Sequence, residues 1–266
     1  IQSRLKTKWV AHPLQFFDSI DSTNIRAKLE AEQGAESGLL VVSDMQSAGR
    51  GRRGRGWESP AGTNIYYTLM LKPDFSSDCA PMLTLVMALA VAKGIRQTLR
   101  RDSEEAAAKV GIKWPNDIVV DGKKVCGILT EMSMEQGYIQ HIVIGVGINV
   151  RKQEFPEEIR DRAAAIDEQC GFRISRSQLI ADIMEAFEED YEIFLRTHDL
   201  KGLRASYAEL LVNQDREVCV LDPKGEYRGI ARGINDQGEL LVERQDGTVE
   251  EVYAGEVSVR GIYGYV

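Results

Sequence analysis

The sequence predicts an α+β protein, with a mixed β-sheet and helices over residues 1–211 and a small β-barrel over residues 212–266. Three observations support this prediction. Two long segments carry apolar residues at helical spacing. Up to residue 150, other apolar and branched residues form short runs typical of strands. After residue 215, turn sequences separate about five short strands, a pattern typical of a small barrel.

The first domain is expected to mix strands and helices along the chain, after a short helix or arm at 1–11. We expect strands at 16–20, 39–44, 64–72, 110–114, 118–120, 125–132 and 139–150. We expect helices at 24–33, 81–99, 175–195 and about 200–211, and a linker at 100–109. Ser22 or Thr23 provides an N-cap for the first helix, and Gly34 ends it. Asp121-Gly122 predicts a hairpin between two strands.

In the second domain, turns are expected at Pro223-Lys224-Gly225, at residues 235–238 and at Asp246-Gly247. A length of 266 residues is enough for one large and one small domain.

Composition excludes several classes of protein. The formal net charge is −8, which is not expected of a general binder of nucleic acid or membrane surfaces. The four cysteines and three histidines are scattered without metal or redox spacing, so we expect reduced thiols in a cytoplasmic protein. The best apolar run, Met82–Ala92, is about half of the ~20 residues that span a bilayer, and no signal peptide is visible.

The most distinctive segment runs from Gly49 to Trp57, where four arginines and four glycines precede the tryptophan. Glycine lets the backbone approach a ligand closely, and arginine supplies a permanent charge and a fork of donors. The segment is therefore predicted to close over a phosphate or carboxylate. The same glycines favour a loop that is disordered without ligand and becomes a lid when ligand binds.

Other interpretations of this loop fit less well. Its glycines match G-x-G-x-x-G, but Pro60 and Gly62 prevent the helix that a dinucleotide fingerprint needs. Trp57 stands where a P-loop would have lysine. A disordered RNA-binding segment or a solvated surface loop is also conceivable, but the segment is short and lies between strands of an acidic protein.

Lys113 lies between apolar Ile112 and Trp114 at a predicted strand end, in the run Lys113-Trp114-Pro115-Asn116-Asp117. A partly buried lysine there could pair with a bound phosphate or carboxylate, because buried lysines are rare unless paired. A lysine that snorkels to solvent, with Pro115 merely ending the strand, is an equal alternative on position alone.

Two further segments combine small and polar residues. Asp21-Ser22-Thr23-Asn24 suits helix capping, which also gathers hydroxyl and N–H groups where a small polar ligand could bind. Gly145-Val146-Gly147-Ile148-Asn149 places two glycines in an apolar strand, where another group could approach closely. Asn149 could contact a base edge or cap a turn.

In this order and spacing, these segments resemble the biotin protein ligase family of bacteria. The resemblance also includes Gln46, Gly127-Ile128-Leu129 and the run from Arg228 to Ile234, and it covers the chain from about Phe16 to its end. It implies a catalytic domain related in fold to class II aminoacyl-tRNA synthetases, followed by an SH3-like barrel. It also implies that biotin and MgATP give biotinyl-5′-AMP, and that a lysine of a biotin carboxyl carrier domain then receives the biotinyl group.

The resemblance assigns roles residue by residue. The catalytic residues would be Lys113 and Arg50. Biotin would contact Ser22, Thr23, Asn24, Gln46, Arg50, Gly51, Arg52, Lys113, Gly127 and Leu129. The nucleotide would contact Arg52, Trp57, Asn149 and Arg232. ATP and Mg²⁺ are the expected cofactors, and no metal ligand is assigned.

Partners and alternatives complete the expectation. We predict a homodimer when the adenylate is bound, formed through an edge strand at Ile139–Val150. Some family members are repressors with a helix-turn-helix domain, so DNA binding depends on such a domain preceding Ile1. A lipoate ligase or octanoyltransferase is the nearest alternative enzyme. A nucleic-acid-binding module that uses the arginine loop is the non-enzymatic alternative, and it would bind in a salt-dependent way.

Overall fold

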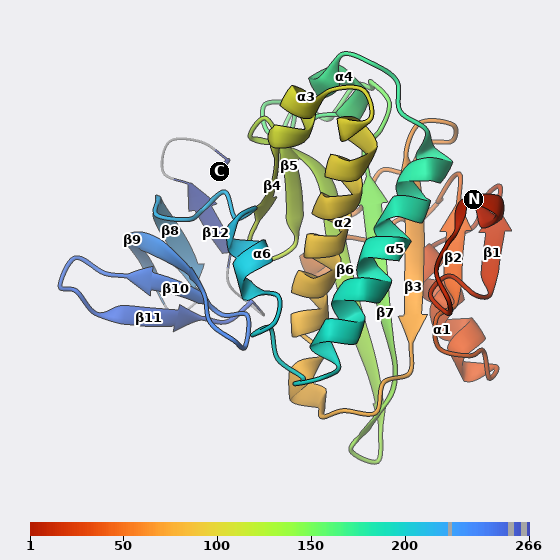
Figure 1. Ribbon diagram of the computed structural model, residues 1–266, viewed down its shortest axis with the longest axis horizontal. Coiled ribbons are helices and arrows are strands. Elements are labelled where there is room, and N and C mark those ends of the chain that lie inside the picture. Colours follow the sequence, from red (N-terminus) through yellow and green to blue (C-terminus); the bar gives the residue numbers. More distant parts are fainter. Residues whose placement is uncertain (223–224, 255–257, 262–264) are drawn as a thin grey trace.

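The computed structural model describes residues 1–222, 225–254, 258–261 and 265–266 and contains two sheets (Figure 1). The larger sheet has seven strands in the order β1-β2-β3-β7-β6-β5-β4. Its strands are β1 (Leu14–Phe17), β2 (Leu40–Ser43), β3 (Ile65–Leu71), β4 (Val110–Lys113), β5 (Asp117–Val120), β6 (Lys123–Glu135) and β7 (Tyr138–Ile148). Only β1 and β2 are parallel; every other neighbouring pair is antiparallel. This sheet is mixed, as predicted.

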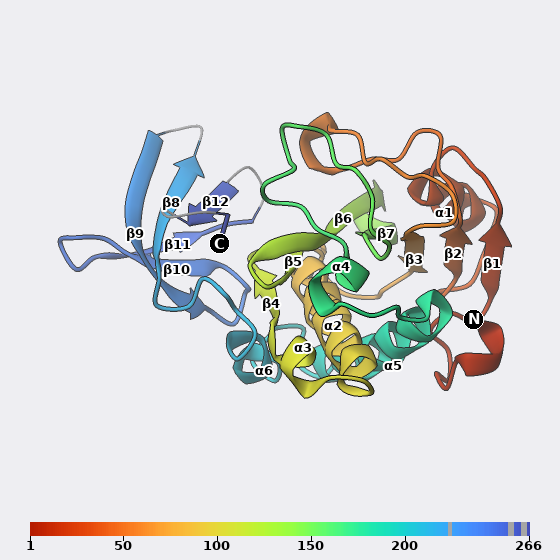
Figure 2. The same cartoon turned by 90° about the horizontal axis from the view of Figure 1, so that it is seen from above.

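Helices cover the two faces of this sheet unequally. The long helices α2 (Met82–Arg100) and α5 (Arg176–Phe194) pack together on one face, where the main apolar core lies. Helix α1 (Thr23–Glu32) covers part of the other face, and Figure 2 shows it across the sheet from α2 and α5. Because side chains alternate along an extended chain, Leu40 and Val42 point into the main core beside α2 and α5. Leu39 and Val41 point into the smaller core beside α1. The rest of the α1 face is left for a cavity.

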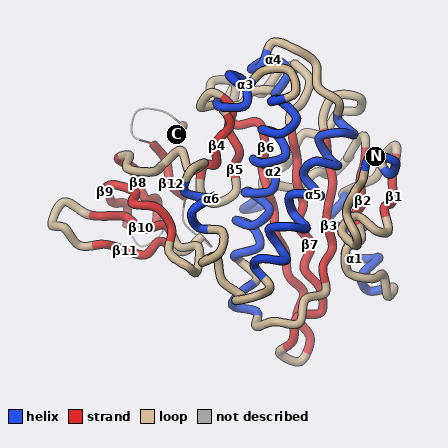
Figure 3. Tube along the Cα trace, viewed as in Figure 1, coloured by secondary structure: helices blue, strands red, loops and turns tan. Residues whose placement is uncertain are grey.

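The smaller sheet has five antiparallel strands in the order β11-β10-β9-β8-β12, and Figure 3 shows it beside the β4 edge of the large sheet. The strands are β8 (Glu217–Asp222), β9 (Gly225–Ile234), β10 (Leu240–Glu243), β11 (Val249–Val252) and β12 (Ser258–Gly261). The predicted turns at 235–238 and 246–247 join strands, whereas Pro223 and Lys224 of the first turn lie outside the described residues. The boundary at residues 211–212 stays a prediction.

Several predicted elements differ from those observed. The strand expected at 16–20 is β1 at Leu14–Phe17, and Ile20 makes only an isolated bridge with Gln46. The expected linker at 100–109 contains the short helix α3 (Glu104–Ala108), which Ser103 caps by accepting from the Ala106 amide. Helix α4 (Ile166–Cys170) was not predicted, because it is too short to show periodicity. The helix α6 covers only Arg204–Ala208.

One further expectation, the edge strand, is wrong. Strand β7 is an interior strand that pairs with β3 and β6 over residues 142–148, so it is not the edge strand expected for a dimer. By length and composition alone, the helical segment Ser77–Arg100 could cross a membrane. Most of this helical segment is buried, and its apolar side chains form the core between the large sheet and α5.

Candidate functional site

A cavity of about 320 Å³ lies on the α1 face of the large sheet. The register of the strands explains its floor. Tyr66, Gly147, Gly127, Asp117 and Lys113 occupy one row across β3, β7, β6, β5 and β4. Because paired residues point to the same face, this row brings the KWPND segment and both glycine segments to one surface.

One end of the cavity is a chain of neutral hydrogen bonds at the start of α1. The Thr68 hydroxyl lies 2.6 Å from Asn24 Oδ1 and 2.8 Å from Thr23 Oγ1. Thr23 donates through its hydroxyl and its amide to Gln46 Oε1, at 3.0 and 2.8 Å. Gln46 Nε2 in turn donates to Ser59 Oγ at 2.9 Å. These partners fix which way each amide group faces.

The other end of the cavity carries charge. Lys113 is only 5% exposed, while Ile112 and Trp114 on either side of it point to the core. Its ammonium lies 4.2 Å from the centre of the Tyr265 ring. Asp117 receives a hydrogen bond from the Tyr265 hydroxyl and forms an ion pair of 2.5 Å with Lys124. Burial opposes ionisation of Asp117, but Lys124 and Lys113 outweigh it and hold the pKa of this carboxyl below its ordinary value.

The arginine loop lies over the cavity in a defined conformation. Arg50 and Gly56 form an isolated antiparallel bridge, and Arg52–Gly54 form a 3-10 turn. Arg52 donates to Asn116 Oδ1 and to the Ala254 carbonyl oxygen, each at 2.7 Å, so the loop contacts the small domain. Burial lowers the pKa of the Arg52 guanidinium. Whether the loop is disordered without ligand stays a prediction.

Trp57, at the end of the loop, lies flat on the glycine row. A Cβ atom added at Gly147 would lie 2.4 Å from the Trp57 indole, so only glycine leaves room for the ring. At Gly145, an added Cβ would lie 2.0 Å from Asn24 Oδ1. Trp57 Nε1 is buried and has no hydrogen-bond acceptor among the residues that the structure describes. Trp57 and the glycines beneath it form one wall of the cavity.

The structure brings together nearly all the residues singled out in the sequence. The cavity is lined by Ser22, Thr23, Asn24, Gln46, Arg50, Gly51, Arg52, Trp57, Lys113, Gly127, Leu129 and Asn149. Arg232 is different: it forms ion pairs with Asp215 and Glu243 on the small domain and does not line the cavity. Its assignment to the nucleotide therefore has no geometric support here. The ligand contacts of the other residues stay predictions.

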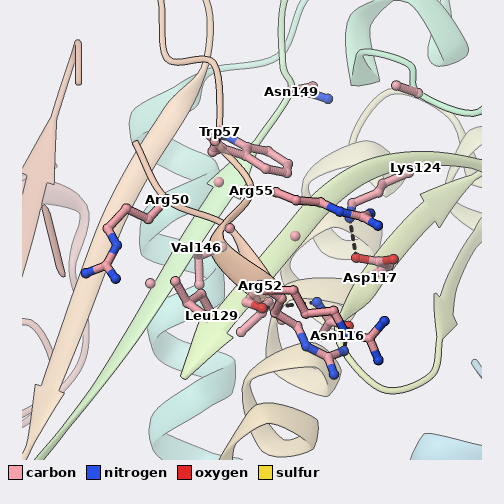
Figure 4. Close-up of a pocket in the computed structure, with 18 of the residues that line it drawn as sticks. Arg50, Arg52, Arg55, Trp57, Asn116, Asp117, Lys124, Leu129, Val146 and Asn149 are labelled. Carbon is pink, nitrogen blue, oxygen red and sulfur yellow. Dashed lines mark hydrogen bonds and ion pairs between the residues drawn. The ribbon is translucent and has the colours of Figure 1, made fainter. Parts of the chain in front are cut away.

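No ligand contact was predicted for several lining residues, notably Lys124, Asn116, Arg55 and Tyr265, although Asn116 and Arg55 lie in segments singled out in the sequence. Lys124 was not predicted to line the cavity because strict alternation would place Val125 opposite Val119. A β-bulge in β6 instead pairs Lys124 with Val119 on the cavity face and leaves Val125 in the core. Figure 4 shows Arg55 and Lys124 directed toward Asp117, whereas Arg50 points away from them. In the sequence, the two lysines that follow the Asp121-Gly122 turn were the signal that could have indicated a cation here.

Comparison with known protein families identifies the class to which this sheet and cavity belong, the biotin and lipoate protein ligases. Residues 16–149 match the family model described as "Biotin/lipoate A/B protein ligase family", and residues 215–260 match the one described as "Biotin protein ligase C terminal domain". Within that class, the chain belongs to the biotin protein ligase family.

Individual relatives agree with this assignment. The chain is 37% identical over 263 residues to "Bifunctional ligase/repressor BirA" of Bacillus spizizenii, covering 97% of this chain and 78% of the relative. It is 30% identical over 242 residues to "Biotin--[acetyl-CoA-carboxylase] ligase" of Paracoccus denitrificans, covering 88% and 98%. The structure of the Aquifex aeolicus biotin protein ligase with biotin and ATP superposes with a TM-score of 0.77 at 28% identity, covering 93% and 98%.

Proposed function

We propose that this protein is an ATP-dependent biotin protein ligase. It makes biotinyl-5′-AMP from biotin and ATP, and then passes the biotinyl group to a lysine of a biotin carboxyl carrier protein. Family membership supports the reaction class, and the cavity supports its chemistry.

The observation that carries this proposal is the charge of the cavity. Among the described lining residues, the cationic ones are Arg50, Arg52, Arg53, Arg55, Lys113, Lys124 and Arg162, and the acidic one is Asp117. Adenylation brings together two anions, a carboxylate and a triphosphate. Preorganised positive charge in a site with little water offsets their repulsion and stabilises the charge that develops in the transition state.

Each bond change can be followed without a protein nucleophile. A carboxylate oxygen of biotin attacks the α-phosphorus of ATP, and pyrophosphate leaves. Lys113 and Lys124 lie beside this charged end of the cavity, and we propose that they stabilise the anionic oxygens. In the second step the carrier lysine, as a neutral amine, attacks the acyl carbon of the mixed anhydride. AMP leaves with the bonding electrons, and the amine proton passes to solvent.

The neutral end of the cavity suits the ureido ring of biotin, which offers one carbonyl acceptor between two N–H donors. Thr23, Asn24 and Gln46 carry donors and acceptors whose directions are already fixed by their neighbours, and Ser22 lines the cavity with them. The arginine loop then closes over the reacting groups, and excluding water protects the anhydride from hydrolysis.

Magnesium belongs to the proposal as a companion of ATP. No group of three His, Cys, Asp or Glu side chains that could hold a metal ion occurs in the described part of the chain. Mg²⁺ keeps several water ligands and is commonly bound through substrate phosphates with few protein ligands, which fits this cavity. When bound, it would neutralise part of the triphosphate charge.

Partner and location proposals follow from family membership. We propose a homodimer when the adenylate is bound, now without β7 as its edge. Strand β5 pairs with β6 only up to Gly127, so the far part of β6 offers an open edge. Sedimentation that shows only monomer, with and without ligand, would contradict a dimer.

DNA binding stays tied to a domain preceding Ile1, and a cytoplasmic location is a further proposal that cell fractionation would test.

The decisive experiment supplies the purified protein with MgATP and either biotin or lipoate. We expect a biotinyl-adenylate by mass spectrometry, stoichiometric pyrophosphate, and transfer to a carrier domain. A lipoyl- or octanoyl-linked product instead would favour the alternative enzymes. Salt-dependent nucleic-acid binding without any adenylate would favour the non-enzymatic alternative.

A further inference from the structure

Glu131 on β6 joins three groups at the border between the neutral end of the cavity and the arginine loop. Its Oε2 accepts a hydrogen bond of 2.8 Å from Asn24 Nδ2. Its Oε1 accepts one of 2.8 Å from Lys28 Nζ and lies 3.7 Å from Arg50 Nη1. The Glu131 side chain is 21% exposed. Burial opposes its ionisation, but the Asn24 and Lys28 hydrogen bonds outweigh that effect and lower its pKa.

The bond to Asn24 decides which way the Asn24 amide faces. An asparagine amide can flip by a half turn, which exchanges its donor and its acceptor. Here the donor is held by Glu131 and the acceptor lies 2.6 Å from the Thr68 hydroxyl. A flipped amide would bring Oδ1 against the Glu131 carboxylate. A carboxylate accepts hydrogen bonds only, so that orientation is repelled.

The contact with Arg50 is of another kind. The Arg50 side chain is 50% exposed and directed away from Asp117 and Lys124, as Figure 4 shows. An ion pair this exposed contributes little net stability, so Arg50 can leave Glu131 when a ligand binds. Lys28, from α1, makes a closer contact of 2.8 Å with the same carboxylate oxygen.

We infer that Glu131 is a positioning residue of the biotin site, acting through Asn24 and Arg50. It fixes the Asn24 amide in the orientation that recognises biotin, and its ion pair keeps Arg50 beside the cavity. This inference rests on the proposed function for the identity of the ligand. It predicts that Glu131 governs biotin affinity and leaves ATP affinity alone, because its partners lie at the neutral end.

Two substitutions separate the two contacts. In Glu131→Gln the side-chain carbonyl can still accept from Asn24, whereas the negative charge near Lys28 and Arg50 is gone. Glu131→Ala removes both contacts. We expect Glu131→Ala to raise the Kd and the KM for biotin about tenfold, as for loss of one well-placed hydrogen bond to a charged group. The KM for ATP should change less than about twofold. Glu131→Gln should restore biotin affinity to within about threefold of the parent.

The matched control is Glu135→Ala, on the same strand but exposed and outside the cavity. Biotin binding is measured by calorimetry without ATP, and melting temperatures confirm folding. The inference is overturned if folded Glu131→Ala binds biotin like the parent, if Glu131→Gln is as weak as Glu131→Ala, or if the KM for ATP rises equally. Should Glu131→Ala not fold, Glu131→Gln must still bind biotin and have an unchanged KM for ATP. A parent protein that makes no biotinyl-adenylate would contradict the proposed function, which is a separate result.

Discussion

The two ends of the cavity achieve binding by different physical means. At the start of α1, neutral side chains are committed to one another through the Thr68, Thr23 and Gln46 hydrogen bonds. At the β4 edge, Lys113, Lys124 and Asp117 form a compact charged cluster next to the Tyr265 ring. Hydrogen bonds are directional and discriminate between similar neutral groups, whereas clustered charge acts on any anion but strongly stabilises developing charge. We therefore expect the first end to set specificity and the second to set rate.

The largest expected effect comes from removing a charge at the β4 edge. Lys113→Ala should reduce the rate of biotinyl-AMP formation on the order of 100-fold or more, by comparison with the loss of one preorganised electrostatic donor. Biotin affinity measured without ATP should fall by a smaller factor, because the proposed contact of Lys113 involves only the biotin carboxylate. Single-turnover adenylation measures the rate, and the exposed Lys123→Ala on β6 is the control. Near-normal synthesis by a folded Lys113→Ala protein would mean that Lys124 carries the charge alone.

A smaller effect should follow from breaking the neutral chain. Thr68 is fully buried, and Thr68→Val keeps its shape while removing the hydroxyl that Asn24 and Thr23 share. We expect biotin to bind about tenfold more weakly, because buried polar groups lose a partner. The adenylation rate at saturating biotin should stay within about threefold of the parent. The exposed Thr248→Val is the control. If the biotin affinity and the adenylation rate fall by the same factor, the division of roles between the two ends is wrong.

The arginine loop covers both ends, and its main effect should be on retention of the intermediate. Arg52 contacts Asn116 and the small domain through Ala254. We expect Arg52→Gly still to make biotinyl-AMP but to release it roughly tenfold faster, because the charge-assisted contacts that close the loop are lost. Released adenylate should then biotinylate lysines of a bystander protein. The dissociation rate and bystander labelling are measured together, with exposed Arg173→Gly as the control. Unchanged retention would place Arg52 in the chemical step or on the surface.

The smallest expected effect concerns pH. The pKa values of Asp117 and Glu131 are both lowered in the folded protein. Such carboxylates contribute stability that is fully present above their unfolded pKa of about 4 and is lost as pH falls through the lower folded value. The melting temperature should therefore decrease on acidification below about pH 4 to 5. Glu131→Gln should weaken this dependence, whereas Glu135→Gln should not. Identical pH profiles for all three proteins would show that Glu131 carries no such linkage.

The sequence by itself determined the elements whose pattern is local. Helices α2 and α5 were predictable because their apolar residues recur at helical spacing, and β3 because its residues are aromatic and branched. The arginine loop and the glycine segments could be identified as parts of a binding site because their chemistry depends on residue type alone. Short elements such as α3 and α4 were missed, since five residues carry too little periodicity.

Only the tertiary structure decided which residues share the cavity. The register across five strands brings Lys113 and Gly147 into one row, and no local pattern specifies that pairing. The bulge in β6 turns Lys124 rather than Val125 toward Asp117, and Tyr265 arrives from the end of the chain. Arg232 shows the opposite case, because its local sequence fits the family pattern while its side chain pairs with Asp215 and Glu243 outside the cavity. Local sequence fixes the chemistry of a residue, but contacts between distant segments depend on packing and register.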